Sequence, residues 1–252
     1  MRRVEAVMGT DASVEIVDPL PPARVAELMD EAFALLHAVD ARFSTYRGDS
    51  EVSQLNAGRQ VEVSPDMREV LSRCAALWNR TGGYFDVYAT GRLDPSGFVK
   101  GWAVQVVSDR LLAAGAANHC VNAGGDVRVR GRSGRGEPWR VAVRHPFEMD
   151  QVCCVLAGTD LAVATSGVYE RGHHVLDPYR GGPAVGLRSV TVVGPDLGEA
   201  DGLATAAVAM GRAGLDWLST VEGYASAVVT DDGRLFCSDD LPLVEGDRTA
   251  GG

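Results

Sequence analysis

Apolar residues at helical spacing predict three helices in the first half of the chain. From Pro22 to Phe43 they recur every three or four positions, as on one face of an amphipathic helix. A second helix is expected from Ser64-Pro65 to Gly82, because serine caps helix starts well and proline suits the first turn. A third helix is expected from about Gly97 to Ala114.

Strand patterns replace helical ones in the rest of the chain. Alternating and β-branched residues over 3–17 predict one strand or a bulged pair around Met8-Gly9-Thr10. From 118 to 193, short β-rich runs alternate with glycine and proline breaks, which predicts a mainly antiparallel sheet. A small-residue helix, EADGLATAAVAMG, follows and can pack closely on that sheet. The last element is a hairpin that turns at Asp232-Gly233.

These elements predict an α+β fold with mainly antiparallel, mixed sheets covered by helices. We expect one globular unit over residues 1–237 and a frayed polar tail over 238–252. With 46% hydrophobic and 23% charged residues, the composition is that of a folded chain rather than a disordered one. The five cysteines include no CxxC pair, so we expect reduced core residues and no zinc site.

Charge and hydropathy exclude two classes of partner. With 34 acidic and 24 basic residues the formal charge is −10, so the protein repels nucleic acid and anionic membrane surfaces. No stretch approaches the roughly 18 apolar residues that a membrane span needs, and no signal peptide is recognisable, so we expect a cytoplasmic location. An anionic substrate would therefore need local help from a metal ion or from helix N-termini.

Asp201 and Thr205 form the first candidate site. They are four residues apart in ADGLATAA, so on a helix both oxygen-bearing side chains lie on one face, one turn apart. A carboxylate and a hydroxyl suit magnesium, which takes oxygen ligands and uses substrate phosphates to complete its octahedron. In the alternative interpretation, Asp201 caps the helix while Thr205 bonds back to the carbonyl of residue 201.

Two further segments contain groups that bind phosphate elsewhere. In LDPSGFVKGWA, Asp94 or Ser96 is expected to cap a helix whose first turn contains Lys100, and helix starts bind phosphate through their N–H groups. The alternative is a helix start with a solvated lysine. In VNAGGD, residues 121–126, the paired glycines allow a close backbone approach or a positive φ; a tight turn between strands is the alternative.

The segment ERGHHVLDPYRGG offers a candidate base. His173 and His174 are adjacent, so in a strand they point to opposite faces and at most one of them is catalytic. A histidine can accept a proton from an attacking hydroxyl near neutral pH; the alternative for each is a surface or capping residue. Asp177-Pro178 is expected to begin a turn through Gly181-Gly182.

Taken in order, eight segments closely resemble the FAD:protein FMN transferase family, the ApbE-type flavin transferases. The segments are MGT (8–10), FSTYRGDSEVSQLN (43–56), TGGYFD (81–86), LDPSGFVKGWA (93–103), VNAGGD (121–126), ATSGVYER (164–171), HVLDP (174–178) and ADGLATAAVAMG (200–211). Each segment alone is weak evidence for the family, but the order and spacing of all eight together are specific to it.

The resemblance implies an α+β fold with FAD in an internal cleft and magnesium (Mg²⁺) at its pyrophosphate. Asp201 and Thr205 match the family's metal-binding helix, with the carbonyls of Gly97 and Ala204 completing the protein ligands. His174 matches the family's catalytic histidine. The remaining matches imply contacts with FAD, and they are Met8, Tyr46, Tyr84, Phe85, Asp86, Asp94, Lys100 and Leu176.

The implied reaction is attack by a Ser or Thr hydroxyl of an acceptor flavoprotein on the FMN-side phosphorus, with AMP leaving. Two alternatives are a magnesium-dependent FAD pyrophosphatase, in which water replaces the hydroxyl, and a flavin-binding protein without catalysis. The chain departs from the family in three ways. We expect it to lack the export signal and lipid-anchoring cysteine of many family members, its connection from residue 86 to 93 is short, and Pro95 stands where the family favours an apolar residue.

Overall fold

The computed structural model of the protein describes residues 1–148, 150–167 and 175–244. Within them the helices are α1 (Pro22–Phe43), α2 (Glu51–Asn56), α3 (Pro65–Arg80), α4 (Ser96–Ala113), α5 (Leu197–Met210) and α6 (Ala213–Leu218). None of these helices is both long and apolar enough to cross a bilayer.

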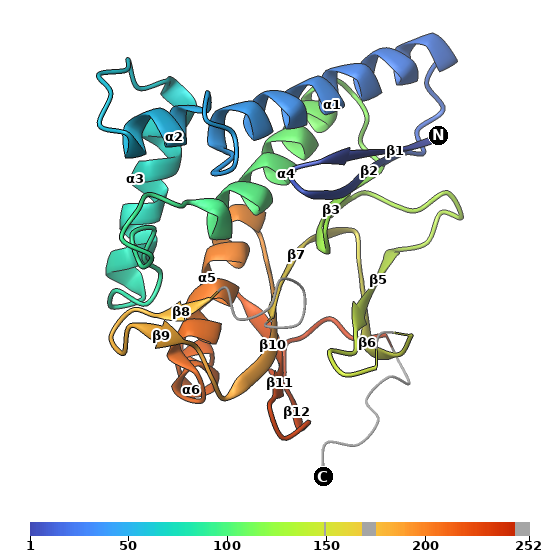
Figure 1. Ribbon diagram of the computed structural model, residues 1–252. Coiled ribbons are helices and arrows are strands. Elements are labelled where there is room, and N and C mark those ends of the chain that lie inside the picture. Colours follow the sequence, from blue (N-terminus) through green and yellow to red (C-terminus); the bar gives the residue numbers. More distant parts are fainter. Residues whose placement is uncertain (149, 168–174, 245–252) are drawn as a thin grey trace.

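The strands form one large sheet and two small ones (Figure 1). The large sheet has the order β1-β2-β3-β4-β7-β10-β11-β12, and all its neighbours are antiparallel. β5 pairs with β6, and β8 with β9, in separate hairpins. The strands are β1 (Arg2–Val7), β2 (Thr10–Ile16), β3 (His119–Ala123), β4 (Asp126–Arg130), β5 (Trp139–Arg144), β6 (Val152–Gly158), β7 (Asp160–Gly167), β8 (Leu176–Asp177), β9 (Gly182–Pro183), β10 (Leu187–Gly194), β11 (Ala225–Thr230) and β12 (Leu235–Cys237). The expected α+β fold with mainly antiparallel sheets is confirmed.

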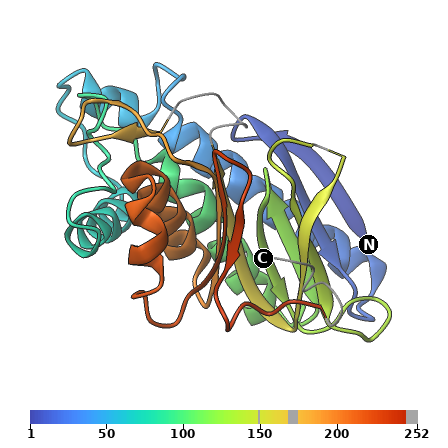
Figure 2. The ribbon, with the colours of Figure 1, turned by 90° about the horizontal axis from the view of Figure 1, so that it is seen from below.

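Helices cover one face of the large sheet, and the β5–β6 hairpin covers part of the other (Figures 1 and 2). Successive strand residues point to opposite faces, so neighbours join different cores. Val192 packs in the helix-side core, whereas Val193 packs with β5 and β6. Ala164 and Val163 on β7 divide in the same way. This double coverage buries most residues of the central strands β4, β7 and β10.

Helix boundaries follow the local capping chemistry. α1 has the expected bounds, and the Ser64 hydroxyl accepts the Met67 N–H at the start of α3. The expected side-chain cap on α4 is wrong: its N-cap is Pro95, and Asp94 instead accepts the Ser96 N–H at 3.0 Å. α5 begins at Leu197, two residues before the expected start, because Asp196 caps it by accepting the Glu199 N–H.

Of the two expectations for residues 3–17, the pair of strands is confirmed and the single strand is wrong, because the chain reverses at Met8-Gly9. Val7 pairs with Thr10, and the two residues between them have φ of 54° and 71°. Two central residues with positive φ make the tight turn that matches strand twist, so β1 and β2 form a hairpin without a bulge. Among the described residues, Met8 alone has a positive φ without being glycine.

Two expectations about the surface need correction. Residues 238–244 are not all a loose tail: Leu241 is buried, and Val244 N donates to Val155 O on β6 at 2.9 Å. Residues 245–252 lie outside the described residues. The five cysteines, all among the described residues, form no disulfide bonds, but they are not all in the core, since Cys237 is exposed.

Candidate functional site

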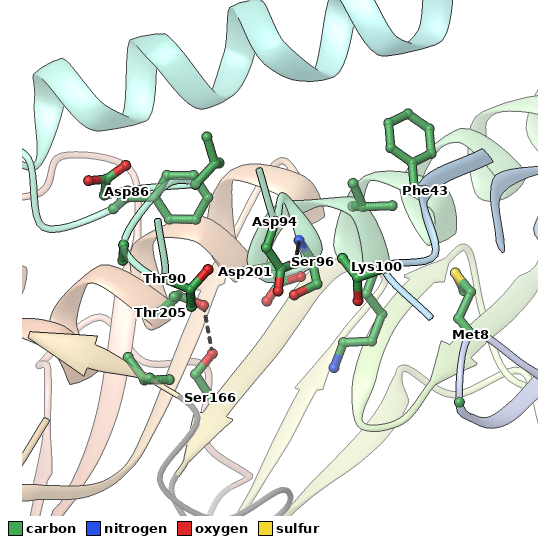
Figure 3. Close-up of a pocket in the computed structure, with 18 of the residues that line it drawn as sticks. Met8, Phe43, Asp86, Thr90, Asp94, Ser96, Lys100, Ser166, Asp201 and Thr205 are labelled. Atoms are coloured by element: carbon green, nitrogen blue, oxygen red, sulfur yellow. Dashed lines mark hydrogen bonds between the residues drawn. The ribbon is translucent and has the colours of Figure 1, made fainter. Parts of the chain in front are cut away.

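A cavity of about 400 Å³ opens beside α5, between the start of α4 and the ends of β7 and β8 (Figure 3). The β1–β2 turn and the chain after α1 close one side, and residues 84–90 form another. Its volume is within the usual range for small-molecule sites. All eight residues expected to contact FAD line this cavity, namely Met8, Tyr46, Tyr84, Phe85, Asp86, Asp94, Lys100 and Leu176.

The aromatic residues of the cavity differ in how firmly they are held. Phe85 is buried, and its N–H donates to the Thr81 hydroxyl at 2.9 Å. Tyr84 lies against Tyr179, with ring centroids 4.9 Å apart. Tyr46 is 94% exposed, so almost its entire ring surface is available to a ligand. An exposed ring at a cavity can stack on another aromatic system.

The two carboxylates of the α3–α4 connection order their own loop. Asp86 accepts the Tyr88 N–H at 2.8 Å, as Asp94 does that of Ser96. The short connection between them forms part of the cavity wall through Val87, Ala89 and Thr90. Pro95 is accommodated as the N-cap of α4, so it does not disrupt the helix that presents Gly97.

Glycines let α4 approach α5 closely. A Cβ on Gly101 would lie 2.5 Å from the Leu197 carbonyl and 2.8 Å from Cβ of Asp201, closer than atoms can pack. A Cβ on Gly97 would lie 3.1 Å from Oγ1 of Thr205. The absence of these side chains brings the α4 backbone against the two oxygen-bearing residues of α5.

Asp201 and Thr205 meet at the cavity, as their spacing predicts. Asp201 is 3% exposed, and its Oδ2 accepts the Gly101 N–H at 3.1 Å. In a regular helix that N–H pairs with the Gly97 carbonyl, so two acceptors compete for one donor. The Thr205 hydroxyl is 3.1 Å from that of Ser166 on β7 (Figure 3). The alternative in which Asp201 caps the helix is wrong, because Asp196 does so.

Asp126 is a second buried carboxylate at this site. The glycines before it, Gly124 and Gly125, have φ of 57° and 95° and make the tight turn between β3 and β4. Asp126 is 0% exposed; its Oδ1 accepts the Thr165 N–H at 3.3 Å, and its Oδ2 lies 3.1 Å from Nζ of Lys100. That contact is an ion pair outside hydrogen-bond geometry, so within the described residues Oδ2 has no hydrogen bond.

Burial dominates the protonation of both acids. Burial raises the pKa of Asp201 well above its ordinary value, and the neighbouring Asp126 raises it further. Burial also raises the pKa of Asp126, while the Lys100 ammonium opposes that shift. Two carboxylates therefore face one ammonium in a site of low dielectric. Additional positive charge would favour their ionised forms.

The oxygen donors at this site fit magnesium. Asp201 and Thr205 present a carboxylate and a hydroxyl, Gly97 brings its backbone beside them, and Asp126 Oδ2 has no hydrogen bond. No three His, Cys, Asp or Glu side chains converge in the described parts of the chain. A cation here would therefore use hydroxyl, backbone and phosphate oxygens as well, which is typical of magnesium.

Two predicted site residues, Ala204 and His174, are not among the described residues that line the cavity. Ala204 is completely buried inside α5 and does not line the cavity, so its role as a ligand stays a prediction. His173 and His174 lie outside the described residues. The turn that follows them is confirmed: Gly181 N donates to Asp177 O at 2.9 Å, and β8 and β9 flank it.

Sequence reasoning missed several residues of the site. Phe43, Thr90, Thr165 and Ser166 line the cavity, and Asp126 is buried beside its residue Lys100. The signal for Asp126 was available, since it directly follows two turn glycines. The strand it begins, DVRVR, alternates polar and apolar residues, which usually indicates one solvent-exposed face. Because that pattern favours exposure, it concealed a buried carboxylate.

Comparison with known proteins agrees with the geometry. The profile of the ApbE family matches residues 8–91 and 88–228. The FAD:protein FMN transferase of Vibrio cholerae is 30% identical over 81% of this chain and 80% of that protein. The protein of the same name from Escherichia coli is 31% identical over 91% of this chain and 84% of its own length.

Solved structures extend this likeness to the fold. The flavin transferase ApbE from Vibrio cholerae has a TM-score of 0.86 at 26% identity, covering 97% of this chain and 99% of that one. The apo form of the Pseudomonas stutzeri flavinyl transferase ApbE has a TM-score of 0.79 at 27% identity, covering 95% of this chain and 94% of that one. With the profile covering most of its length, the chain belongs to the ApbE family.

Proposed function

We propose that this chain is a magnesium-dependent FAD:protein FMN transferase. It cleaves the FAD pyrophosphate and attaches FMN through a phosphoester to a Ser or Thr hydroxyl of an acceptor flavoprotein, releasing AMP. The observation that carries the proposal is the meeting of Asp201, Thr205 and Lys100 in one cavity. Family membership supports it, because the relatives from Vibrio cholerae and Escherichia coli carry that name.

Asp201 and Thr205, with the Gly97 carbonyl, would hold the Mg²⁺ ion, and the Ala204 carbonyl is a further predicted ligand. When bound, Mg²⁺ supplies neutralisation of charge that develops on the pyrophosphate oxygens. Lys100 adds a positive charge on the same wall of the cavity. Transfer of a phosphoryl group depends mainly on positioning and electrostatics, so these residues are expected to matter more than a base.

FAD would lie along the rest of the cavity. The exposed ring of Tyr46 offers a stacking surface, and Met8 and Leu176 offer apolar contacts. Tyr84 and Phe85 form a further apolar wall. Asp86 and Asp94 are expected to contact FAD beside the loop hydrogen bonds that they already accept.

His174 is the proposed base. Beside the acceptor hydroxyl, its imidazole would accept the proton as the oxygen attacks phosphorus, a contribution of roughly 10²–10⁴-fold for general bases. His173 is the matched control, because in the strand that the sequence predicts here the two adjacent residues would point to opposite faces. His174→Ala should lose FMN attachment while still binding FAD, whereas His173→Ala should retain attachment.

The test follows three products at once. Purified protein is incubated with FAD, Mg²⁺ and cell lysate or a Ser/Thr acceptor peptide; AMP, free FMN and covalent flavin are then measured separately. AMP formed together with covalent flavin supports the transferase. AMP with free FMN and no covalent product would instead support the FAD pyrophosphatase, and FAD binding without AMP a non-catalytic flavin-binding protein. The cytoplasmic location of the acceptor stays a prediction.

A further inference from the structure

A pair of hydroxyls joins α5 to the central strand β7 at the cavity. The Thr205 hydroxyl oxygen lies 3.1 Å from that of Ser166, and the two side chains point toward each other (Figure 3). Both residues line the cavity. Ser166 shares the helix-side face of β7 with Ala164, because residues two apart on a strand point to the same face. The contact therefore depends on the packing of α5 against the sheet.

The Thr205 side chain is also confined from the other side, by α4. A Cβ on Gly97 would lie 3.1 Å from Oγ1 of Thr205 and 3.2 Å from its Cγ2, so the glycine allows a close approach. Threonine has few side-chain rotamers, because two heavy atoms branch from its Cβ. The hydroxyl oxygen is therefore held between α4 and β7, and the direction of its hydrogen is what stays open.

The direction of that hydrogen decides whether the oxygen is available to a cation. A hydroxyl that donates its hydrogen to a neighbour keeps its lone pairs for a metal ion, whereas a hydroxyl that accepts uses one of them. On a helix, threonine otherwise donates to the carbonyl four residues earlier, here that of Asp201. Ser166 offers a different acceptor, 3.1 Å away on another element. Its oxygen can accept because it carries two lone pairs besides its own hydrogen.

We propose that Ser166 is a positioning residue that accepts a hydrogen bond from the Thr205 hydroxyl and thereby leaves the Thr205 lone pairs free for a divalent cation. The inference rests on the proposed function, because it takes Thr205 as a ligand of the metal. Ser166 acts through Thr205, in the way that outer groups which orient metal ligands raise the affinity for the metal.

A second pair of hydroxyls on the same strand provides a comparison. Thr165 on β7 and Thr191 on β10 have hydroxyl oxygens 2.9 Å apart. Thr191 is completely buried and is not one of the residues that line the cavity. This pair joins two strands of the sheet, so its loss should affect stability but not metal binding.

The test is a double-mutant cycle on Mn²⁺ affinity, measured by electron paramagnetic resonance on the purified protein without FAD. Ser166→Ala should bind Mn²⁺ about tenfold more weakly than wild type, in line with the loss of groups that orient metal ligands. Thr205→Val keeps the branched shape but removes the hydroxyl, and it should lose at least as much affinity. In the Thr205→Val background, Ser166→Ala should change the affinity by less than about twofold, because no hydroxyl is left to orient.

The cycle separates positioning from two other roles of Ser166. If Ser166 bound the cation itself, or if its loss damaged the fold, Ser166→Ala would weaken Mn²⁺ binding equally in both backgrounds, and the inference would be overturned. Thermal unfolding in EDTA checks that each variant is folded. If Ser166→Ala does not fold, the same cycle is run with Ser166→Cys, whose thiol is a weak acceptor.

Thr191→Val is the matched control, because it removes one hydroxyl of the other pair on β7. It should leave Mn²⁺ affinity unchanged. A loss of affinity as large as that of Ser166→Ala would show that any change in the hydroxyls of this strand disturbs the site, and it would overturn the inference.

The remaining outcomes separate the inference from the proposed function. Equal Mn²⁺ affinity in wild type and Ser166→Ala, with affinity lost in Asp201→Asn, would overturn the inference alone. The same holds if affinity is lost in Asp201→Asn but unchanged in Thr205→Val, since Thr205 would then not be a ligand. Mn²⁺ binding that is absent in wild type or unchanged in Asp201→Asn would overturn the metal assignment in the proposed function, and the inference with it.

Discussion

The interface between α4 and β4 buries polar groups at both of its ends. At one end these groups are hydrogen-bonded to one another, whereas at the other end one buried oxygen has no hydrogen bond among the described residues. Away from the cavity, Arg128 Nε donates to Gln105 Oε1 at 3.1 Å, and Arg130 binds Ser108 and Asp109. At the cavity end, Asp126 faces Lys100 with an oxygen that has no hydrogen bond among the described residues. The same two elements therefore carry a complete network and an incomplete one.

The difference between the two ends indicates where a buried polar interface can bind a ligand. Buried polar groups are nearly always hydrogen-bonded, so a complete network needs nothing further and contributes to structure. An incomplete network beside a cavity leaves donors and acceptors for a bound molecule. The two ends should therefore respond differently to substitution: the cavity end through chemistry, the far end through stability.

The largest contrast is expected between two aspartates of the neighbouring helices. Asp201→Asn should slow release of AMP from FAD by at least about a hundredfold, or about 2.7 kcal/mol of transition-state stabilisation, because it removes the charged ligand proposed for the metal. Asp109→Asn, at the far end of α4, should stay within about twofold of wild type. Steady-state rates at limiting Mg²⁺ measure both. Similar rates in the two variants would remove the distinction between the ends.

Arg128→Met should have the largest effect on stability. The guanidinium is 2% exposed and links α4, β4 and Asp160, but Asp160 is 62% exposed and stays hydrated when the arginine is lost. We therefore expect a loss of about 2 kcal/mol in the free energy of unfolding, below the roughly 3–5 kcal/mol of fully buried pairs. Urea unfolding measures the loss. FAD affinity of the folded variant should match wild type, and a large loss of affinity would show that the far end also shapes the site.

His119 should make the far end sensitive to acid. It is completely buried, its Nδ1 donates to the Ala116 carbonyl at 2.7 Å, and its Nε2 accepts from the Ser108 hydroxyl at 2.7 Å. Burial lowers the pKa of His119; the nearby Arg128 and Arg130 lower it further, while the Ala116 carbonyl and Asp18 oppose the shift.

The unfolded chain thus takes up the His119 proton at a higher pH than the folded protein does. The stability that neutral His119 contributes is complete above about pH 6.5, the ordinary imidazole pKa, and is lost as the pH falls toward the lower folded pKa. The melting temperature of wild type should fall more steeply than that of His119→Gln between about pH 7.5 and 5. Parallel curves would show that other groups dominate.

The smallest effect is expected at the exposed edge of the cavity. Tyr46→Ala should weaken FAD binding by about 1 kcal/mol through loss of a stacking surface, with no change in stability because the ring is almost fully exposed. Tyr88→Ala is the matched control, since Tyr88 is also exposed but does not line the cavity. Fluorescence titration of FAD compares them, and equal dissociation constants in both variants would place Tyr46 outside the FAD site.

Much of the molecule was predictable from the sequence because its signals are local. Apolar spacing located α1, the Ser64 cap located the start of α3, and the glycine pair before Asp126 indicated a tight turn. The spacing of Asp201 and Thr205 placed their side chains on one face of α5, where both line the cavity. Each of these depends on neighbours within a few residues, which a sequence displays directly.

Only the tertiary structure decided which segments far apart in the sequence pack together and which of their residues become buried. The alternation in β4 is typical of a strand with one solvent-exposed face, yet both faces are covered, and Asp126 and Arg128 are buried against α4. The reversal at Met8-Gly9 needed a positive φ that methionine rarely adopts. Burial and the pairing of charges depend on which surfaces meet, and that is a property of the packed chain rather than of any stretch of sequence.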